Sequence, residues 1–131
     1  MKKSYQNELM KRKFLKFLGA NVRYSKSTVY LHERTILLWQ ECHANSEFSR
    51  FGNQQVAIFK AWLEGRENHK GRQLSLVYRY NVLRLLRKFF GWLVVQPGYK
   101  SKINPSIIET LSLSREESRM ARQPNRREIP S

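Results

Sequence analysis

Residues 75–95 read SLVYRYNVLRLLRKFFGWLVV, the longest helical pattern in the chain. Apolar side chains recur in it every three or four positions: Tyr78, Val82, Leu85, Leu86, Phe89 and Leu93. This period is that of an α-helix, so we expect one helix with a buried apolar face. Basic residues occupy its other faces, and Pro97-Gly98 provides the stop signal.

The same kind of pattern continues on both sides of this segment. We expect further helices at about 5–18, at 27–43, from Asn53 to Gly65, after Asn104-Pro105, and from a Ser114–Glu117 capping box to Pro124. The expected inward stripes of the first three are Leu9, Met10, Phe14, Phe17 and Leu18; Leu31, Thr35, Leu38, Trp39 and Cys42; and Val56, Phe59 and Leu63. Residues 45–49 and the mostly basic segment 66–72 are expected to be loops. Because no series of segments alternates with a β period, the predicted fold class is all-α.

Composition narrows the class of partner. The chain has 131 residues, enough for one domain, and its 25 Lys and Arg against 10 Asp and Glu give a formal net charge of +15. Such a charge attracts polyanions. Nucleic acid is the commonest polyanionic partner of a domain of this kind, and an anionic membrane surface is the second. No apolar run approaches the roughly 20 residues of a membrane helix, and no secretory segment follows the N-terminus. The single Cys42 fits a reducing compartment, so a cytoplasmic location is expected.

Motifs of self-contained enzymes are missing from the sequence. There is no P-loop, no glycine-rich dinucleotide fingerprint and no nucleophile elbow. The histidines and Cys42 lack zinc spacing, and the adjacent Glu116-Glu117 pair suits the first turn of a helix better than acid–base catalysis. We therefore expect no catalytic centre, no cofactor and no metal site in this chain.

The remaining signal is basic side chains on otherwise well-packed helices. Lys26 precedes the hydroxyls of Ser27 and Thr28 at the start of a helix, where exposed N–H groups suit a phosphate; simple capping is the alternative role of the hydroxyls. The helix at 75–95 carries four cations that could enter a DNA groove or simply be solvated: Arg79, Arg84, Arg87 and Lys88. Its Phe89, Phe90 and Trp92 are expected in the core rather than stacked on bases.

Four ordered stretches carry a family resemblance: STVYLHER at 27–34, LLRKFFGWL at 85–93, INP at 103–105 and RREIP at 126–130. From about Phe14 to Pro130 they resemble the core-binding (SAM-like) domain of tyrosine recombinases and phage integrases. His32 stands where that family usually has Tyr, and Trp39 fills its next aromatic position.

The resemblance implies a four- to five-helix bundle, at residues 1–123, that closes a C-shaped clamp on double-stranded DNA at a recombination site. Its second and fourth helices would face the DNA, with contacts from Lys26, Ser27, Thr28, Arg34, Arg79, Asn81, Arg84, Arg87 and Lys88. Tyr78 is a weaker candidate because its spacing also fits the core stripe. Residues 124–131 would be the linker to a following catalytic domain, which holds the family's catalytic residues, so this chain is expected not to cleave DNA. We expect the domain alone to be monomeric and to meet other recombinase protomers through the full-length protein.

Two other interpretations use the same charge. One is a stand-alone basic helical regulator that binds DNA or RNA, for which the linker-like end would have no purpose. The other is a membrane-surface protein with a basic amphipathic first helix at residues 2–18, which leaves the arginine-rich helix at 75–95 unexplained.

Overall fold

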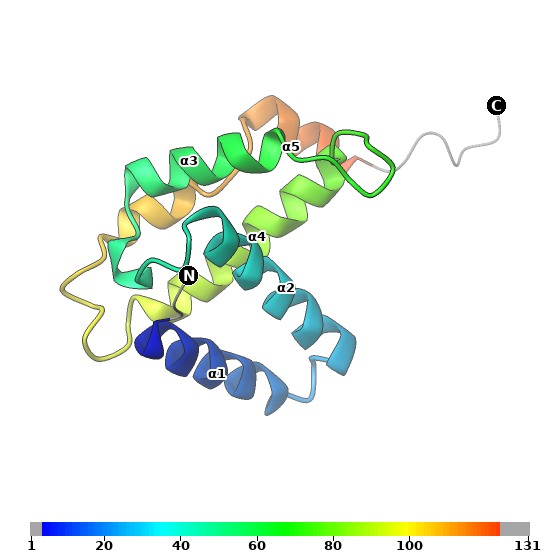
Figure 1. Ribbon diagram of the computed structural model, residues 1–131. Helices are drawn as coiled ribbons and strands as arrows, with labels where there is room; N and C mark the ends of the chain where they lie inside the picture. The colour runs from blue at the N-terminus through cyan, green and yellow to red at the C-terminus, as the bar shows by residue number, and fades with distance from the viewer. Residues whose placement is uncertain (1–3, 124–131) are drawn as a thin grey trace.

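The computed structural model describes residues 4–123, and these form α-helices and short 3-10 helices without a β-strand (Figure 1). The elements are α1 (Tyr5–Gly19), α2 (Lys26–Cys42), η1 (Phe48–Arg50), α3 (Asn53–Glu64), α4 (Leu76–Leu93), η2 (Pro105–Thr110) and α5 (Arg115–Arg122). The all-α prediction is therefore confirmed for the described part of the chain. The predicted linker at 124–131 lies outside the described residues, as do residues 1–3.

Serine side chains start four of the five described α-helices. Ser4, Ser25, Ser75 and Ser114 each accept a hydrogen bond from the backbone N–H three residues later. This bond satisfies one of the donors that the first turn of a helix leaves without a partner. The predicted cap at Ser114 is confirmed, because Glu117 N–H donates to Ser114 Oγ at 3.1 Å; the Glu117 carboxylate accepts from Ser114 Oγ at 3.2 Å.

Two short segments differ from expectation. Phe48–Arg50, in the predicted loop after α2, forms the 3-10 helix η1, because the buried Phe48 ring fixes that segment on the core. The backbone N–H of Phe48 also donates to Asn7 Oδ1 of α1 at 2.8 Å. The helix predicted after Asn104 is confirmed, but as a 3-10 helix, with Asn104 Oδ1 accepting from Ser106 N–H.

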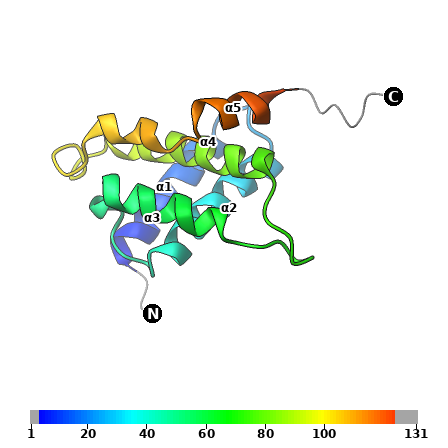
Figure 2. The same ribbon diagram turned by 90° about the horizontal axis from the view of Figure 1, so that it is seen from above.

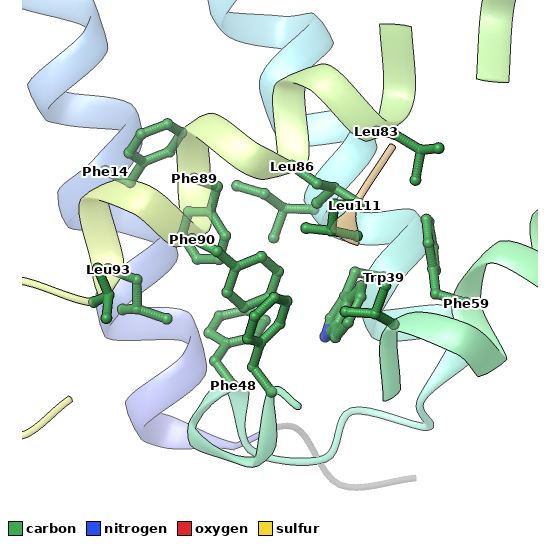
Figure 3. Close-up of a cluster of buried hydrophobic side chains, with 14 of the residues drawn as sticks. Phe14, Trp39, Phe48, Phe59, Leu83, Leu86, Phe89, Phe90, Leu93 and Leu111 are labelled. Carbon is green, nitrogen blue, oxygen red and sulfur yellow. The ribbon is translucent and has the colours of Figure 1, made fainter. Parts of the chain in front are cut away.

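Helix α4 runs through the middle of the bundle and contacts α1, α2, η2 and α5 (Figures 1 and 2). It supplies the aromatic centre of the core, since Phe89 and Phe90 are fully buried. In Figure 3 these rings point into the space that Phe14, Phe48 and Trp39 fill from other elements. The centroid of Phe89 lies 5.1 Å from those of both Phe14 and Phe48, and Phe90 lies 4.9 Å from Trp39, in edge-to-face geometry. Substitution at Phe89 would therefore disturb three elements at once.

The buried surface of α4 is wider than the predicted stripe. Val82, Leu86, Phe89 and Leu93 of the stripe are buried as expected, and so is Phe90, but Leu83 and Val94, which directly follows the helix, are buried as well. Helix α4 has neighbours on two sides, with α1 and α2 on one and η2 and α5 on the other, so two stripes are covered. Of the predicted stripe, Leu85 is only half-buried and Tyr78 is 44% exposed.

Two predicted core residues on other helices are exposed. Leu31 of α2 and Phe17 of α1 are each 55% exposed, so the inward positions predicted for them are wrong. Leu31 lies on the N-terminal half of α2 and faces an open groove instead of a neighbouring helix. Phe17 lies near the end of α1, where the centroid of its ring is 6.5 Å from that of Phe14 and 6.4 Å from that of Trp92. Across residues 4–123, no helix combines the length and the apolar character needed to cross a membrane.

Candidate nucleic-acid interface

A groove of about 540 Å³ lies between α2 and α4. Its walls come from these helices and from the segment before α2: Tyr24, Thr28, Leu31, His32, Arg34, Thr35, Tyr78, Asn81, Val82, Arg84, Leu85 and Lys88. Five of the predicted DNA-binding residues are in this set, namely Thr28, Arg34, Asn81, Arg84 and Lys88. None of the lining residues is acidic, so the groove presents cations without local neutralisation.

The cations of the groove lie on its rim, with exposed side chains. Arg84 Nη2 donates to Asn81 Oδ1 at 3.2 Å, one turn earlier on α4. Lys88 Nζ donates to Tyr24 Oη at 2.5 Å and lies 5.0 Å from the centroid of that ring. These contacts orient the two α4 cations and leave further N–H groups of both to meet an anion.

The floor of the groove is mostly apolar and includes a buried histidine. His32 is only 2% exposed, and its Nδ1 has no hydrogen-bond partner among the described residues. Burial, with the nearby charges of Lys88 and Arg84, lowers the pKa of His32 to about 4. The imidazole is therefore neutral at physiological pH, mainly because it is buried and to a smaller extent because the two rim cations disfavour its charged form.

The N-terminus of α2 borders the groove through Thr28. Ser25 is the capping residue, and its Oγ lies 3.0 Å from Ser27 Oγ and 3.1 Å from Thr28 Oγ1. The capping role considered for Ser27 and Thr28 is therefore wrong, because Ser25 Oγ already accepts the Thr28 N–H. Lys26 and Ser27 are exposed at this end of the helix.

Two predicted contact residues of α4 lie away from the groove. Arg87 is half-buried, its Nη1 donates to the backbone carbonyl of Leu111, and burial lowers its pKa. Arg79 is also half-buried; its Nε donates to the carbonyl of Leu74 at 3.3 Å, and it lines a separate groove beside Glu64 and Glu117.

Helical rotation explains this division. Successive residues turn by about 100°, which puts Asn81 and Lys88 within about 60° of Arg84 on the groove side. The same rotation turns Arg87 about 60° and Arg79 about 140° the other way, toward η2 and α5. The expectation that Arg87 is a freely exposed side chain is therefore wrong, and Arg79 does not share a groove with Arg84.

Sequence reasoning missed Tyr24, which lies in the connection between α1 and α2. It is half-buried against the core and holds Lys88, but a single aromatic residue in a loop has no periodic signal. The weaker candidate Tyr78 does line the groove and is exposed. Within residues 4–123, no group of three His, Cys, Asp or Glu side chains could hold a metal ion.

Comparison of the chain with protein-family models, with curated proteins and with solved structures finds no significant match in any of the three.

Proposed function

We propose that the chain binds double-stranded DNA through the α2–α4 groove, as a SAM-like core-binding domain of a tyrosine recombinase. One observation carries the proposal: five side chains that the sequence assigns to DNA contact line a single groove without an acidic residue. They come from α2 and α4, the two helices that face DNA in the family that the sequence resembles. The strand-cleaving chemistry and the contacts between protomers would belong to the rest of a full-length recombinase.

Each part of the groove suits a different part of the duplex. Arg34 and Lys88 on the rim, with Lys26 and the hydroxyls at the start of α2, suit phosphate oxygens. Asn81 and Arg84 are the side chains that suit base edges, because Asn pairs with adenine and Arg with guanine in the major groove. The apolar floor beside Leu31 and Leu85 suits thymine methyl groups.

The test is a fluorescence-anisotropy titration of a labelled duplex at several salt concentrations. We expect log K to fall by roughly 0.9 per phosphate contact for each log unit of salt. The double variant Arg84→Gln/Lys88→Gln should bind more weakly and with a shallower salt slope. Its matched control is Lys100→Gln/Lys102→Gln, which removes the same charge from exposed positions in the loop after α4.

Salt-insensitive binding by the wild type, or equal losses in the two double variants, would contradict the assignment of the groove. A duplex RNA and a single-stranded RNA of the same length serve as competitors. If either displaces the DNA at equal concentration, the stand-alone RNA-binding alternative is favoured. Stronger binding to anionic vesicles than to DNA would favour the membrane-surface alternative.

A further inference from the structure

We propose that residues 66–73, a basic hairpin between α3 and α4, form a second contact with the DNA backbone beyond the α2–α4 groove. This inference rests on the proposed function, since it extends the surface over which the duplex would lie. The sequence predicts only a loop here, and none of the predicted contact residues falls within it. Three observations support the inference: the hairpin is held in one shape, the side chains of Lys70 and Arg72 have no ion-pair partner among the described residues, and the groove beside the hairpin joins the first one.

Asn68 fixes the shape of the hairpin. Its Oδ1 accepts from the backbone N–H groups of Lys70 and Arg72, at 2.8 and 3.1 Å. Its own N–H donates to the Arg72 carbonyl at 2.7 Å, and its carbonyl accepts from Gly71 N–H at 2.9 Å. Gly71 has a φ of +75°, which glycine adopts without strain, and Glu67 forms a β-bridge with Gln73. The tip of the hairpin is therefore ordered before any ligand binds.

The charges of the hairpin have two different roles. Arg66 anchors its base: Nη1 lies 2.5 Å from Glu41 Oε2 of α2, and the guanidinium lies 4.5 Å from the centroid of Trp62. Lys70 and Arg72 are exposed, and no described residue forms an ion pair or a hydrogen bond with either side-chain cation. A fixed base and unpaired cations at the tip suit a polyanion that lies beside the bundle.

The hairpin groove continues the first groove. It is lined by residues 66–69, 72 and 73 of the hairpin, which include the acidic Glu67, by Leu74 and Ser75 before α4, and by Arg34, Leu38 and Tyr78. Lys70 is exposed at the tip of the hairpin, outside this lining. Arg34 and Tyr78 also line the α2–α4 groove, so the two meet along α2 and the first turns of α4. In both ribbon views the hairpin projects at the right-hand side, beyond the N-terminal end of α4 (Figures 1 and 2).

Because DNA is stiff, a duplex that lies in the α2–α4 groove would also pass the hairpin. Duplex DNA has a persistence length of about 150 base pairs, so a duplex in the first groove runs nearly straight past Arg34. It carries one charge for about every 1.7 Å of its axis, so phosphates are available wherever it passes the cations of the hairpin. We therefore assign Lys70 and Arg72 to phosphates that flank those met by the α2–α4 groove.

The experiment compares wild type with Lys70→Gln/Arg72→Gln in the same anisotropy titration. At about 0.15 M salt each lost phosphate contact should weaken binding roughly 5-fold, and two contacts roughly 30-fold. The salt slope should become shallower by about 0.9 for each contact. The control Lys100→Gln/Lys102→Gln changes the charge equally in the loop at the opposite end of both ribbon views, and it should change the affinity less than 2-fold (Figures 1 and 2). Thermal melts of both variants show whether the fold is intact.

A second variant tests the fixed shape of the hairpin without changing its charge. Asn68→Ala removes the acceptor of two backbone N–H groups, so the tip must be ordered when DNA binds. We expect a weaker affinity, by about 2- to 5-fold, with an unchanged salt slope, because the same phosphates are met at a greater entropic cost.

The outcomes separate this inference from the proposed function. If the wild type does not bind DNA, the proposed function itself is wrong. If Arg84→Gln/Lys88→Gln weakens binding but Lys70→Gln/Arg72→Gln behaves like the control pair, the groove assignment stands and the hairpin contact is wrong. A hairpin variant with a weaker affinity and a shallower slope, in a protein that melts like wild type, supports the contact.

Discussion

Replacing Arg87 with alanine should destabilise the fold rather than act first on DNA binding. The guanidinium donates to the backbone carbonyl of Leu111, a residue that is 0% exposed at the end of η2. A hydrogen bond with a charged donor contributes about 1.5–3 kcal/mol, and the variant leaves the carbonyl without this partner. For a domain of this size, each kcal/mol lowers Tm by roughly 3–5 °C. We therefore expect Arg87→Ala to lower Tm by about 5–15 °C.

Arg84→Ala is the matched control on the same helix. Arg84 is exposed, and its side chain donates only to the neighbouring Asn81 among the hydrogen bonds of the described residues. Surface polar contacts contribute about 0–1 kcal/mol, so Tm should change by no more than about 5 °C. Loss of DNA binding should be the main effect, by about 1–3 kcal/mol if the guanidinium contacts a base. The two variants should therefore show opposite patterns.

Thermal melts followed by circular dichroism, together with anisotropy titrations at 20 °C, measure both quantities on the same protein samples. Arg87→Lys keeps a charged donor and should recover part of the lost stability. The reasoning is refuted if Arg87→Ala melts like wild type while its DNA affinity falls as far as that of Arg84→Ala. That result would place Arg87 on the contact surface and make its bond to Leu111 irrelevant to folding.

Three further predictions concern the core, the pH dependence of stability and the expected absence of DNA cleavage by this chain. Phe89→Ala should cost about 3–5 kcal/mol in a chemical denaturation experiment, because it empties a fully buried site between α1, η1 and α4, and a loss below about 1 kcal/mol would contradict this packing. Burial lowers the pKa of His32 from 6.5 to about 4, so the unfolded chain binds the proton more tightly than the folded one. The contribution of His32 to the free energy of unfolding should therefore be complete above pH 6.5 and should fall by about 3 kcal/mol as the pH drops to 4. His32→Phe should remove this part of the pH dependence and leave the part due to His43, whose pKa burial also lowers, and a variant with the same pH profile as wild type would rule out His32 as its source. Incubation with a supercoiled plasmid should yield neither nicks nor a covalent protein–DNA band on a denaturing gel, and either product would show that the chain has a cleavage centre of its own.

The helices could be predicted because each carries its own local signal. The start of α4 follows from the Ser75 cap, and its length from an apolar period that continues until Pro97-Gly98. Likewise Ser114 and Glu117 mark α5 through a capping box that needs no tertiary partner. Helix starts and stops therefore agree with the structure to within about two residues, except where the tertiary contacts of Phe48 create η1.

The separation of contact residues from structural ones could not be predicted. Arg84 and Arg87 are equivalent in sequence, each an arginine next to the apolar stripe of one helix. What separates them is η2, which brings the Leu111 carbonyl to Arg87 from 24 residues away. Leu31 is the converse case: its spacing fits the inward stripe of α2, but among residues 4–123 no element covers its side of that helix. The placement of neighbouring elements determines whether each of these side chains is exposed or packed against another part of the fold.

If the chain binds DNA as proposed, His32 would couple the stability of the fold to binding at Lys88 on the rim of the groove. Its ring contacts Phe14 of the core at a centroid distance of 5.7 Å and Tyr24 at 6.2 Å. Tyr24 in turn accepts the hydrogen bond from Lys88, so one series of contacts leads from the core to a rim cation. A phosphate bound at Lys88 and Arg84 would offset two of the charges that lower the pKa of His32, while the larger effect of burial would remain. Binding at the rim and protonation at the floor are then thermodynamically linked, and by reciprocity a protonated His32 would favour the phosphate. On the proposed function, a substitution at His32 should change stability and DNA binding together, whereas a substitution at Arg84, which is exposed on the rim, should change DNA binding with little effect on folding.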